Sequence, residues 1–595
     1  MNRKYFFIIL IPALMLSFFA AAEPVSKDET REAALKFFGM TKAASVIEEV
    51  NGGANRGFTV YNHKGGGWVI ISKDDAVSPV LAYSHTGRFS FDEMSDGLGW
   101  WVNAAESYID NASRSSLPRH HGWDMVSTKG TADEYVLETA LWHQKNPFNI
   151  SYPIAYDADG IPGHNYVGCV AAAAGIICRY HEWPEVGTGV IPEYTYKDDF
   201  GVTHTNPERI PGTYDFGNMP LAVDDDTPEE QIKAISDFLY DVSASLRTIF
   251  HYPSGSAASS GLVNIMMARH FGYDKNMKIA VRDLYSEQAW TELIRNEIRN
   301  VGPVHYSGHD SSLGGHSFVL DGFADEGYFH INWGWGGENN GFFLLSALNV
   351  VHNGKDYAFN ASQEAILGFK PDRDATSECL FPIVFDYDED FNGLEIVEGV
   401  PEPGQVFSVK AGYFTNLSSA IFTGRAAIAL FDKDDKLKEV VSEYYDFTDY
   451  LNLYEANFKD NIPDNSVVWD AIPCRITGPV RPGDRLRMCL LTDTYTSWVI
   501  GIDETVPVMI PVMDIAPDEV PDATSLSYDK TSGIMTFSST LVVDYKLVDS
   551  AGNVVDEYQA EAGNPFTLDT KSLGSALYTL YIYGGVDPYV LTLKL

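Results

Sequence analysis

The chain has 595 residues, a formal net charge of −40 and only five cysteines. Its length predicts several domains, because a single hydrophobic core seldom serves more than about 250–300 residues. The acidic excess repels nucleic acid and anionic membrane surfaces, so it excludes binding to either as a general function. Five cysteines in so long a chain also exclude a disulfide-stapled scaffold, and an odd number leaves at least one thiol unpaired.

The first 22 residues have the pattern of a signal peptide. Arg3 and Lys4 precede an apolar stretch from Tyr5 to Phe19, and Ala20-Ala21-Ala22 offers a small-residue cleavage site. The apolar stretch is too short for a spanning helix, and no other run of about 18 apolar residues follows it. We therefore expect an exported protein without a membrane span, which is secreted, periplasmic or held at the cell surface.

Residues 23–131 have the pattern of a small α+β unit. Two helices and two buried strands are expected, at 28–38, 100–109, 67–72 and 80–83. From Ser113 to Lys129 the chain turns polar and basic, which is the composition of an exposed and cleavable linker.

Residues 132–371 hold the segments that carry chemistry, the first of them at Cys169. Gly168-Cys169-Val170 opens an alanine-rich stretch that predicts a buried helix over 168–181, and a second helix is expected over 229–247. A thiol at a helix N-terminus lies in the positive end of the helix dipole, which favours the nucleophilic thiolate. The alternative is a helix that begins with small residues only because they pack well.

Four further side chains are candidates to complete a catalytic set. His316 starts an apolar run, and a histidine paired with the thiol takes its proton and returns it to a leaving group; the alternative is a core or turn histidine. Asn332 is a candidate to orient the imidazole, and an adjacent indole would shield that hydrogen bond from water. Gln144 lies in a turn-rich loop upstream, where its amide either donates to an oxyanion or only caps the loop.

These segments resemble the streptopain family of papain-like cysteine peptidases, in the family's order, from about residue 135 to 371. The matching stretches are 142–149, 167–171, 179–184, 252–260, 302–306, 314–322, 330–337 and 341–349. The resemblance implies that Cys169 is the nucleophile, His316 the general base and acid, and Gln144 the oxyanion donor. It also implies that Asn332 and Trp333 form the orienting and shielding pair.

The resemblance implies a substrate cleft and an inhibitor as well. The cleft would bind protein or peptide substrates, with an apolar side chain at the second position before the cut, and no cofactor. Its lining residues would be Ser254, Gly255, Ser256, Gly315 and Trp335. Residues 23–131 resemble the family's propeptide, which implies a zymogen inhibited by its own N-terminal segment. His143 and the alanine run 171–174 depart from the family pattern, but neither removes a reacting group.

From residue 372 onward, short alternating strands and regular turn signals predict two all-β sandwich (Ig-like) modules, 372–515 and 516–595, with a linker at 515–522. They are expected to position the catalytic domain or to bind a surface or host ligand. The predicted fold class is thus α+β: a papain-like domain between an α+β propeptide and two β-modules. The rival functions are a non-enzymatic adhesive protein and a cell-wall amidase or transpeptidase.

Metal and disulfide signals are weak. Asp388, Asp390 and Asn392 match the first half of a calcium loop, but position 12 is Gly399, which favours an ordinary acidic turn. No H-E-x-x-H, C-x-x-C or P-loop motif is present, so no metal or nucleotide is predicted. A pairing of Cys474 with Cys489 is left open.

Overall fold

A computed structural model describes most of the chain up to residue 379 and, beyond it, mainly separate strands and loops. The described ranges are 23–40, 46–50, 56–92, 94–114, 118–124, 126, 134–198, 200–282, 285, 287–310, 314–324, 327–348, 351–352, 355–356, 363–377, 379, 383–386, 394–411, 413–416, 418–450, 467–468, 471–481, 483–492, 499–500, 513–514, 524–529, 534–539, 543–549, 554–560, 566–569, 577–583 and 589–594. The predicted signal peptide lies outside them.

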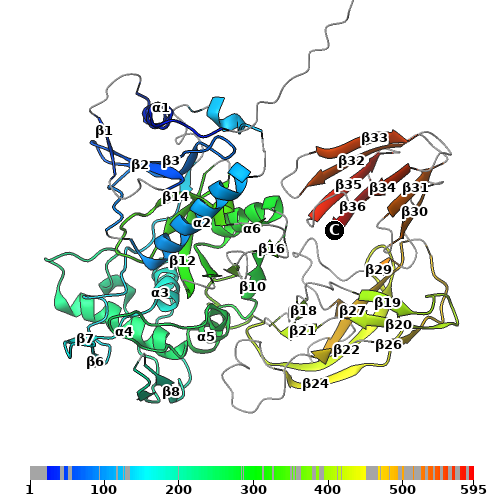
Figure 1. Cartoon of the computed structure of the whole chain (residues 1–595). Coiled ribbons are helices and arrows are strands. Elements are labelled where there is room, and N and C mark those ends of the chain that lie inside the picture. The colour runs from blue at the N-terminus through cyan, green and yellow to red at the C-terminus, as the bar shows by residue number, and fades with distance from the viewer. Residues whose placement is uncertain are drawn as a thin grey trace, which may run out of the picture.

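One 11-stranded sheet forms the backbone of the N-terminal part (Figure 1). Its strands are β1 (Ile47–Glu49), β2 (Phe58–His63), β3 (Trp68–Ser72), β4 (Val80–Ser84), β5 (Tyr135–Val136), β10 (Lys278–Val281), β11 (Val304–Asp310), β12 (Gly314–Phe323), β13 (Tyr328–Asn332), β14 (Gly341–Leu344) and β17 (Glu364–Leu367). Their order is β1-β2-β3-β4-β14-β13-β12-β11-β17-β10, and β5 pairs with β12. All these pairings are antiparallel.

Residues before the predicted linker form β1–β4 with two helices, α1 (Lys27–Phe37) and α2 (Asp96–Arg114). Helix α1 begins at a capping box, in which Ser26 accepts from the Glu29 N–H and the Glu29 carboxylate accepts from the Ser26 N–H. The expected strands are confirmed, and the second expected helix is longer than predicted. Strand β4 pairs with β14, with Tyr83 opposite Phe342, so the sheet continues across the predicted boundary at 131/132.

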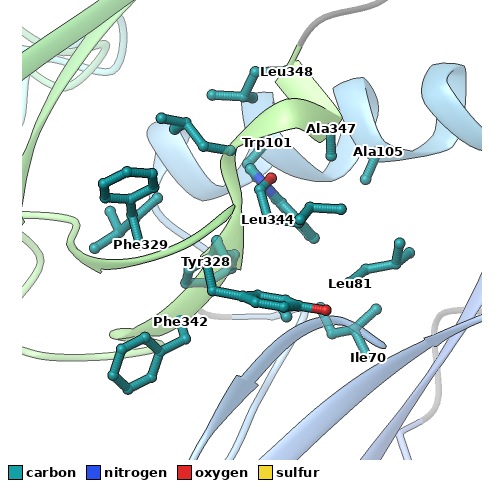
Figure 2. Close-up of a cluster of buried hydrophobic side chains, with 14 of the residues drawn as sticks. Ile70, Leu81, Trp101, Ala105, Tyr328, Phe329, Phe342, Leu344, Ala347 and Leu348 are labelled. Carbon is teal, nitrogen blue, oxygen red and sulfur yellow. The ribbon is translucent and has the colours of Figure 1, made fainter. Parts of the chain in front are cut away.

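The N-terminal unit and the following domain also share a hydrophobic core. Figure 2 shows Ile70 and Leu81 from β3 and β4 near Trp101 of α2, together with Tyr328 and Phe342 from β13 and β14. Helix α6 (Glu287–Asn300) adds Trp290, Ile294 and Ile298 to the same cluster. Because these side chains are almost fully buried, separating the two units exposes a large apolar surface to water.

A second core lies between the sheet and three other helices: α3 (Cys169–His181), α4 (Glu229–Ser245) and α5 (Val263–His270). The helices expected over 168–181 and 229–247 are thereby confirmed. Successive residues of β12 point to opposite faces, so Phe318 belongs to the first core and Val319 to the second. Three short antiparallel strand pairs described in this part of the chain lie outside this sheet: β6 (Ile154–Tyr156) with β7 (Pro162–His164), β8 (Tyr194–Lys197) with β9 (Thr203–Asn206), and β15 (Val351–His352) with β16 (Lys355–Asp356).

Every element described after β17 is a strand, as the alternating pattern predicts. These strands are β18 (Ile383–Asp386), β19 (Leu394–Glu398), β20 (Val406–Ala411), β21 (Tyr413–Asn416), β22 (Phe422–Phe431), β23 (Leu437–Val440), β24 (Tyr445–Tyr450), β25 (Val467–Val468), β26 (Ile472–Arg475), β27 (Arg485–Thr492), β28 (Val499–Ile500), β29 (Met513–Asp514), β30 (Thr524–Asp529), β31 (Ile534–Ser539), β32 (Val543–Asp549), β33 (Val554–Ala560), β34 (Phe566–Asp569), β35 (Leu577–Tyr583) and β36 (Tyr589–Lys594). They pair in several small antiparallel sheets, the largest built on β22 and β27. Their assembly into two Ig-like sandwiches stays a prediction, and the expected linker at 515–522 lies outside the described residues.

The predicted exposed linker is only partly described, and its described part is anchored. Arg119 forms an ion pair with Asp75 at 2.5 Å, and its guanidinium lies 5.6 Å from the Trp123 ring centroid. The Trp123 indole donates to the Val77 carbonyl at 2.9 Å. Residues 118–124 are therefore held against the N-terminal unit, because Arg119 pairs with the nearly buried Asp75 carboxylate. Residues 127–133 lie outside the described residues.

All five cysteines are free thiols, so Cys474 and Cys489 do not pair. The reason is strand alternation in β22: Cys474 packs with Ile428 on one face, and Cys489 packs with Ala427 on the other. Cys178 is fully buried, and burial raises the pKa of its thiol to about 12.

Within the described ranges, no helix is both long and apolar enough to cross a bilayer. The same residues contain no group of three or more His, Cys, Asp or Glu side chains arranged to hold a metal ion. The partial calcium loop at 388–392 falls outside them.

Candidate active site

Cys169 is the first residue of α3 and is half-buried. The preceding Gly168 has a φ of 89°, and an added Cβ there would lie 3.0 Å from the Ser256 carbonyl oxygen, so only glycine fits. The alanines that follow are buried against the sheet and α4. The thiol is thereby fixed at the positive end of a rigid helix dipole, which favours its ionised form.

His316 lies on β12, opposite Gly308 of β11, and is half-buried beside the exposed Gly315. By strand alternation it is on the face that carries Phe318, while Val319 faces α3. Helix α3 packs directly against β12. The helix that begins with the thiol and the strand that carries the imidazole are therefore neighbours in the fold.

Gln144 is half-buried in the loop that leads toward α3. Its carbonyl accepts from the Val167 N–H at 3.0 Å, two residues before the thiol. The buried Trp142 anchors the same loop by donating its indole N–H to the Pro220 carbonyl at 2.9 Å. The loop is held against the start of α3, where an oxyanion donor is needed.

Asn332 is fully buried on β13, and its amide has partners other than the imidazole. It donates to the Thr139 hydroxyl at 2.9 Å and to the Ala140 carbonyl at 3.0 Å, and its oxygen accepts from the Gly334 N–H at 3.1 Å. Register with β12 places its side chain on the sheet face opposite that of His316. The Asn332 amide therefore anchors residues 139–140, which come shortly before Gln144, to β13.

Trp333 lies on the same sheet face as His316 and is almost fully buried. Its ring centroid is 5.0 Å from that of Phe318. An added Cβ at Gly97 of α2 would lie 3.0 Å from the indole. The N-terminal unit therefore touches the predicted shielding residue directly.

The predicted cleft residues at 254–256 lie beside the start of α3. Ser256 is buried, its carbonyl approaches Gly168, and its hydroxyl accepts from the His251 N–H at 3.0 Å. Gly255 has a φ of 106°, and Ser254 is exposed. This segment therefore forms a turn next to the thiol-bearing helix.

Trp335, the last predicted cleft residue, packs against the loop that carries Gln144. Its ring centroid is 4.2 Å from that of His143, and the Gly336 N–H donates to the Trp142 carbonyl at 3.1 Å. Burial, aided by the Lys145 ammonium, lowers the pKa of His143 to about 4, so this imidazole is neutral near pH 7.

Lys145 was not predicted as a site residue, although it lies inside one of the matching stretches. Its ammonium is 4.6 Å from the centroid of the Trp335 ring and 5.2 Å from that of Tyr166. Sequence reasoning missed it because its two aromatic neighbours come from distant parts of the chain.

A buried polar network behind the site was also missed. The Asp321 carboxylate accepts from the Thr139 hydroxyl at 2.5 Å and pairs with the His330 ring. Burial alone would lower the pKa of His330, but the facing Asp321 carboxylate outweighs burial and raises it. The network joins Thr139, shortly before the Gln144 loop, to Asp321 of β12 and His330 of β13. The sequence indicates it only by placing polar residues within otherwise apolar strands.

Helix α2 covers the sheet face that carries His316. Trp100 of α2 is fully buried, with its ring centroid 6.1 Å from that of Phe318. An added Cβ at Gly308, the residue opposite His316, would lie 2.4 Å from the Trp100 indole. The N-terminal unit thus fills the space over the strand pair that holds the imidazole.

Two family models match this chain. The model described as "Peptidase C10 family" matches residues 142–343, and that described as "Spi protease inhibitor" matches residues 22–109. The second match covers most of the N-terminal unit that lies over the candidate site.

Curated relatives agree with these matches. The chain is 32% identical over 370 residues to the thiol protease/hemagglutinin PrtT of Porphyromonas gingivalis, across 60% of this chain but only 41% of that protein. It is 30% identical over 407 residues to streptopain of Streptococcus pyogenes, across 62% of this chain and 100% of streptopain. A solved fragment of prointerpain A from Prevotella intermedia covers 55% of this chain and 99% of the fragment, at 24% identity and a TM-score of 0.45.

Proposed function

Because the chain belongs to the peptidase C10 family of cysteine peptidases, we propose that it is a secreted endopeptidase made as a zymogen, with Cys169 and His316 as its reacting pair. The resemblance to the streptopain family drawn from the sequence is thereby confirmed. The signal-peptide pattern at residues 1–22 supports export.

The placement of the site residues supports the following mechanism. The Cys169 thiolate attacks a peptide carbonyl, while the Gln144 amide and the Cys169 backbone N–H donate to the developing oxyanion. His316 gives its proton to the leaving amine, and the acyl-enzyme is then hydrolysed by water with His316 as general base. Asn332 is a positioning residue that holds the segment before Gln144, and Trp333 shields the imidazole face. No cofactor takes part.

The observation that carries the zymogen proposal is the packing of α2 over the His316 face of the sheet. Gly97 lies against Trp333, and Trp100 lies against Gly308. The β4–β14 pairing and the shared core hold this cover in place. A protein substrate needs access to the strand pair that carries the imidazole, so the cover must leave before the site works at full rate.

The test is to incubate the purified full-length chain, with and without a thiol-reactive epoxide, and to follow its mass and its cleavage of casein. The proposal predicts loss of about 12 kDa, the mass of a ~110-residue propeptide, together with caseinolysis that the epoxide blocks. A stable, inert chain that the epoxide never labels would favour the non-enzymatic rival.

A further inference from the structure

The Lys145 ammonium is a cation held by aromatic rings. It lies over the faces of Trp335 and Tyr166, within the distance at which a cation–π attraction acts. Within the described part of the chain, no carboxylate lies at ion-pair distance from it. This contrasts with Lys233 and Lys438, which pair with Asp237 and Asp484.

The position of this cation is set by three segments that also carry the candidate catalytic groups. Lys145 follows Gln144, whose backbone carbonyl accepts a hydrogen bond from the Val167 N–H. Tyr166 comes three residues before Cys169, and Trp335 comes from the loop that follows Trp333. The ammonium therefore belongs to the loop expected to bind the oxyanion, and Lys145 as a residue is only half-buried.

Among the residues that the structure describes, no acidic side chain neutralises the Lys145 ammonium. The adjacent His143 imidazole is neutral near pH 7 and supplies no counter-charge. The two rings fix the lysine in place and satisfy it only partly, because a cation–π contact is weaker than a hydrogen-bonded ion pair with a carboxylate. A carboxylate is the group that pairs most strongly with a lysine ammonium.

We propose that Lys145 is a specificity-determining residue that selects substrates with an aspartate or glutamate directly beside the scissile bond. The inference rests on the proposed peptidase function. Lys145 forms no bond to the reacting atoms; its ammonium attracts the substrate side chain, and Trp335 and Tyr166 keep it in position. The net negative charge of the protein repels acidic peptides. A cation next to the scissile bond can therefore favour an acidic substrate side chain in a way that a distant lysine does not.

The experiment compares pairs of fluorogenic peptides that are identical except for Glu or Gln on either side of the scissile bond, with a constant apolar residue two positions before it. The full chain is first allowed to process itself, and kcat/KM is measured for each member of a pair. The variants are Lys145→Met and Lys145→Glu. The matched control is Lys197→Met, which removes the same charge from an exposed position on the β8–β9 hairpin.

The wild type is expected to prefer Glu over Gln by about 3- to 10-fold on one side of the bond, as a partly exposed charge pair provides. Lys145→Met should bring the ratio to one, Lys145→Glu should invert it, and Lys197→Met should leave it unchanged. Added salt should reduce the wild-type ratio.

Two results would overturn the inference. The first is a wild-type ratio of one on both sides of the bond. The second is an equal fall in kcat/KM for both peptides in Lys145→Met, with a lower melting temperature, which would make Lys145 only a brace between loops. A processed protein that cleaves no member of any pair contradicts the proposed function itself, and this inference with it.

Discussion

Trp100 occupies the space that any larger residue at position 308 would need, since a Cβ on Gly308 would lie 2.4 Å from the indole. Gly308 stands opposite His316, so the N-terminal unit presses on the strand pair that carries the imidazole. The close contact that requires glycine at this position therefore comes from the N-terminal unit, and we expect the requirement to end when that unit is removed.

Gly308→Ala should accelerate maturation. In the precursor the added methyl group meets the Trp100 ring, and overpacking of this kind destabilises by about 1–3 kcal/mol. In the processed enzyme the Trp100 ring is removed with the N-terminal unit, so we expect β11 to accommodate alanine at position 308. The measurement is the rate of self-processing of the purified precursor. Gly99→Ala on α2, where an added Cβ meets nothing within 4 Å, is the matched control. Equal rates for Gly308→Ala and the wild type would contradict the account.

Cys169→Ala should abolish both peptidase activity and self-processing while the fold stays intact, because a half-buried thiol at the helix start contributes little packing. Processing is followed by mass and folding by the thermal melt. Cys178→Ala is the companion variant: its fully buried thiol is structural, so this variant should lose stability but retain activity. Normal maturation of Cys169→Ala would show that another protease makes the cut.

Gln144→Ala should lower kcat by on the order of 10²–10³, the usual effect of removing one oxyanion donor. KM should change far less, because the donor acts mainly on the transition state. Gln231→Ala, in the first turns of α4, is the control that changes the same residue type away from the site. A fall of only a few-fold at position 144 would make Gln144 a loop-capping residue.

The His330–Asp321 pair should make stability depend on pH. The folded state raises the pKa of His330 above the value of about 6.5 that it has when unfolded. The stabilisation is therefore complete below about pH 6.5 and is lost as pH rises through the folded pKa. The difference in melting temperature between the wild type and His330→Gln should shrink as the pH rises above about 6.5. A difference that is constant or grows with pH would contradict this.

Local sequence patterns were sufficient for the elements that depend on near neighbours. The helices expected over 28–38, 168–181 and 229–247 are all present in the structure. The order of the matching motifs also placed the thiol helix and the imidazole strand in one domain.

Features that depend on distant pairing could not be read from the sequence. Nothing local to Tyr83 or Phe342 shows that their strands join one sheet. The free state of Cys474 and Cys489 follows from the alternation of a strand that carries neither residue. The aromatic neighbours of Lys145 likewise meet it only in the folded chain.

The most direct test of the central claim is to identify which of the five free thiols reacts with a thiol-directed epoxide, by peptide mass spectrometry of the self-processed chain, with residual activity measured in parallel. The account predicts labelling at Cys169 alone, with activity falling in proportion to the labelled fraction, and slower labelling of the precursor under its α2 cover. Full activity with Cys169 completely labelled, or inactivation that follows another cysteine, would contradict it.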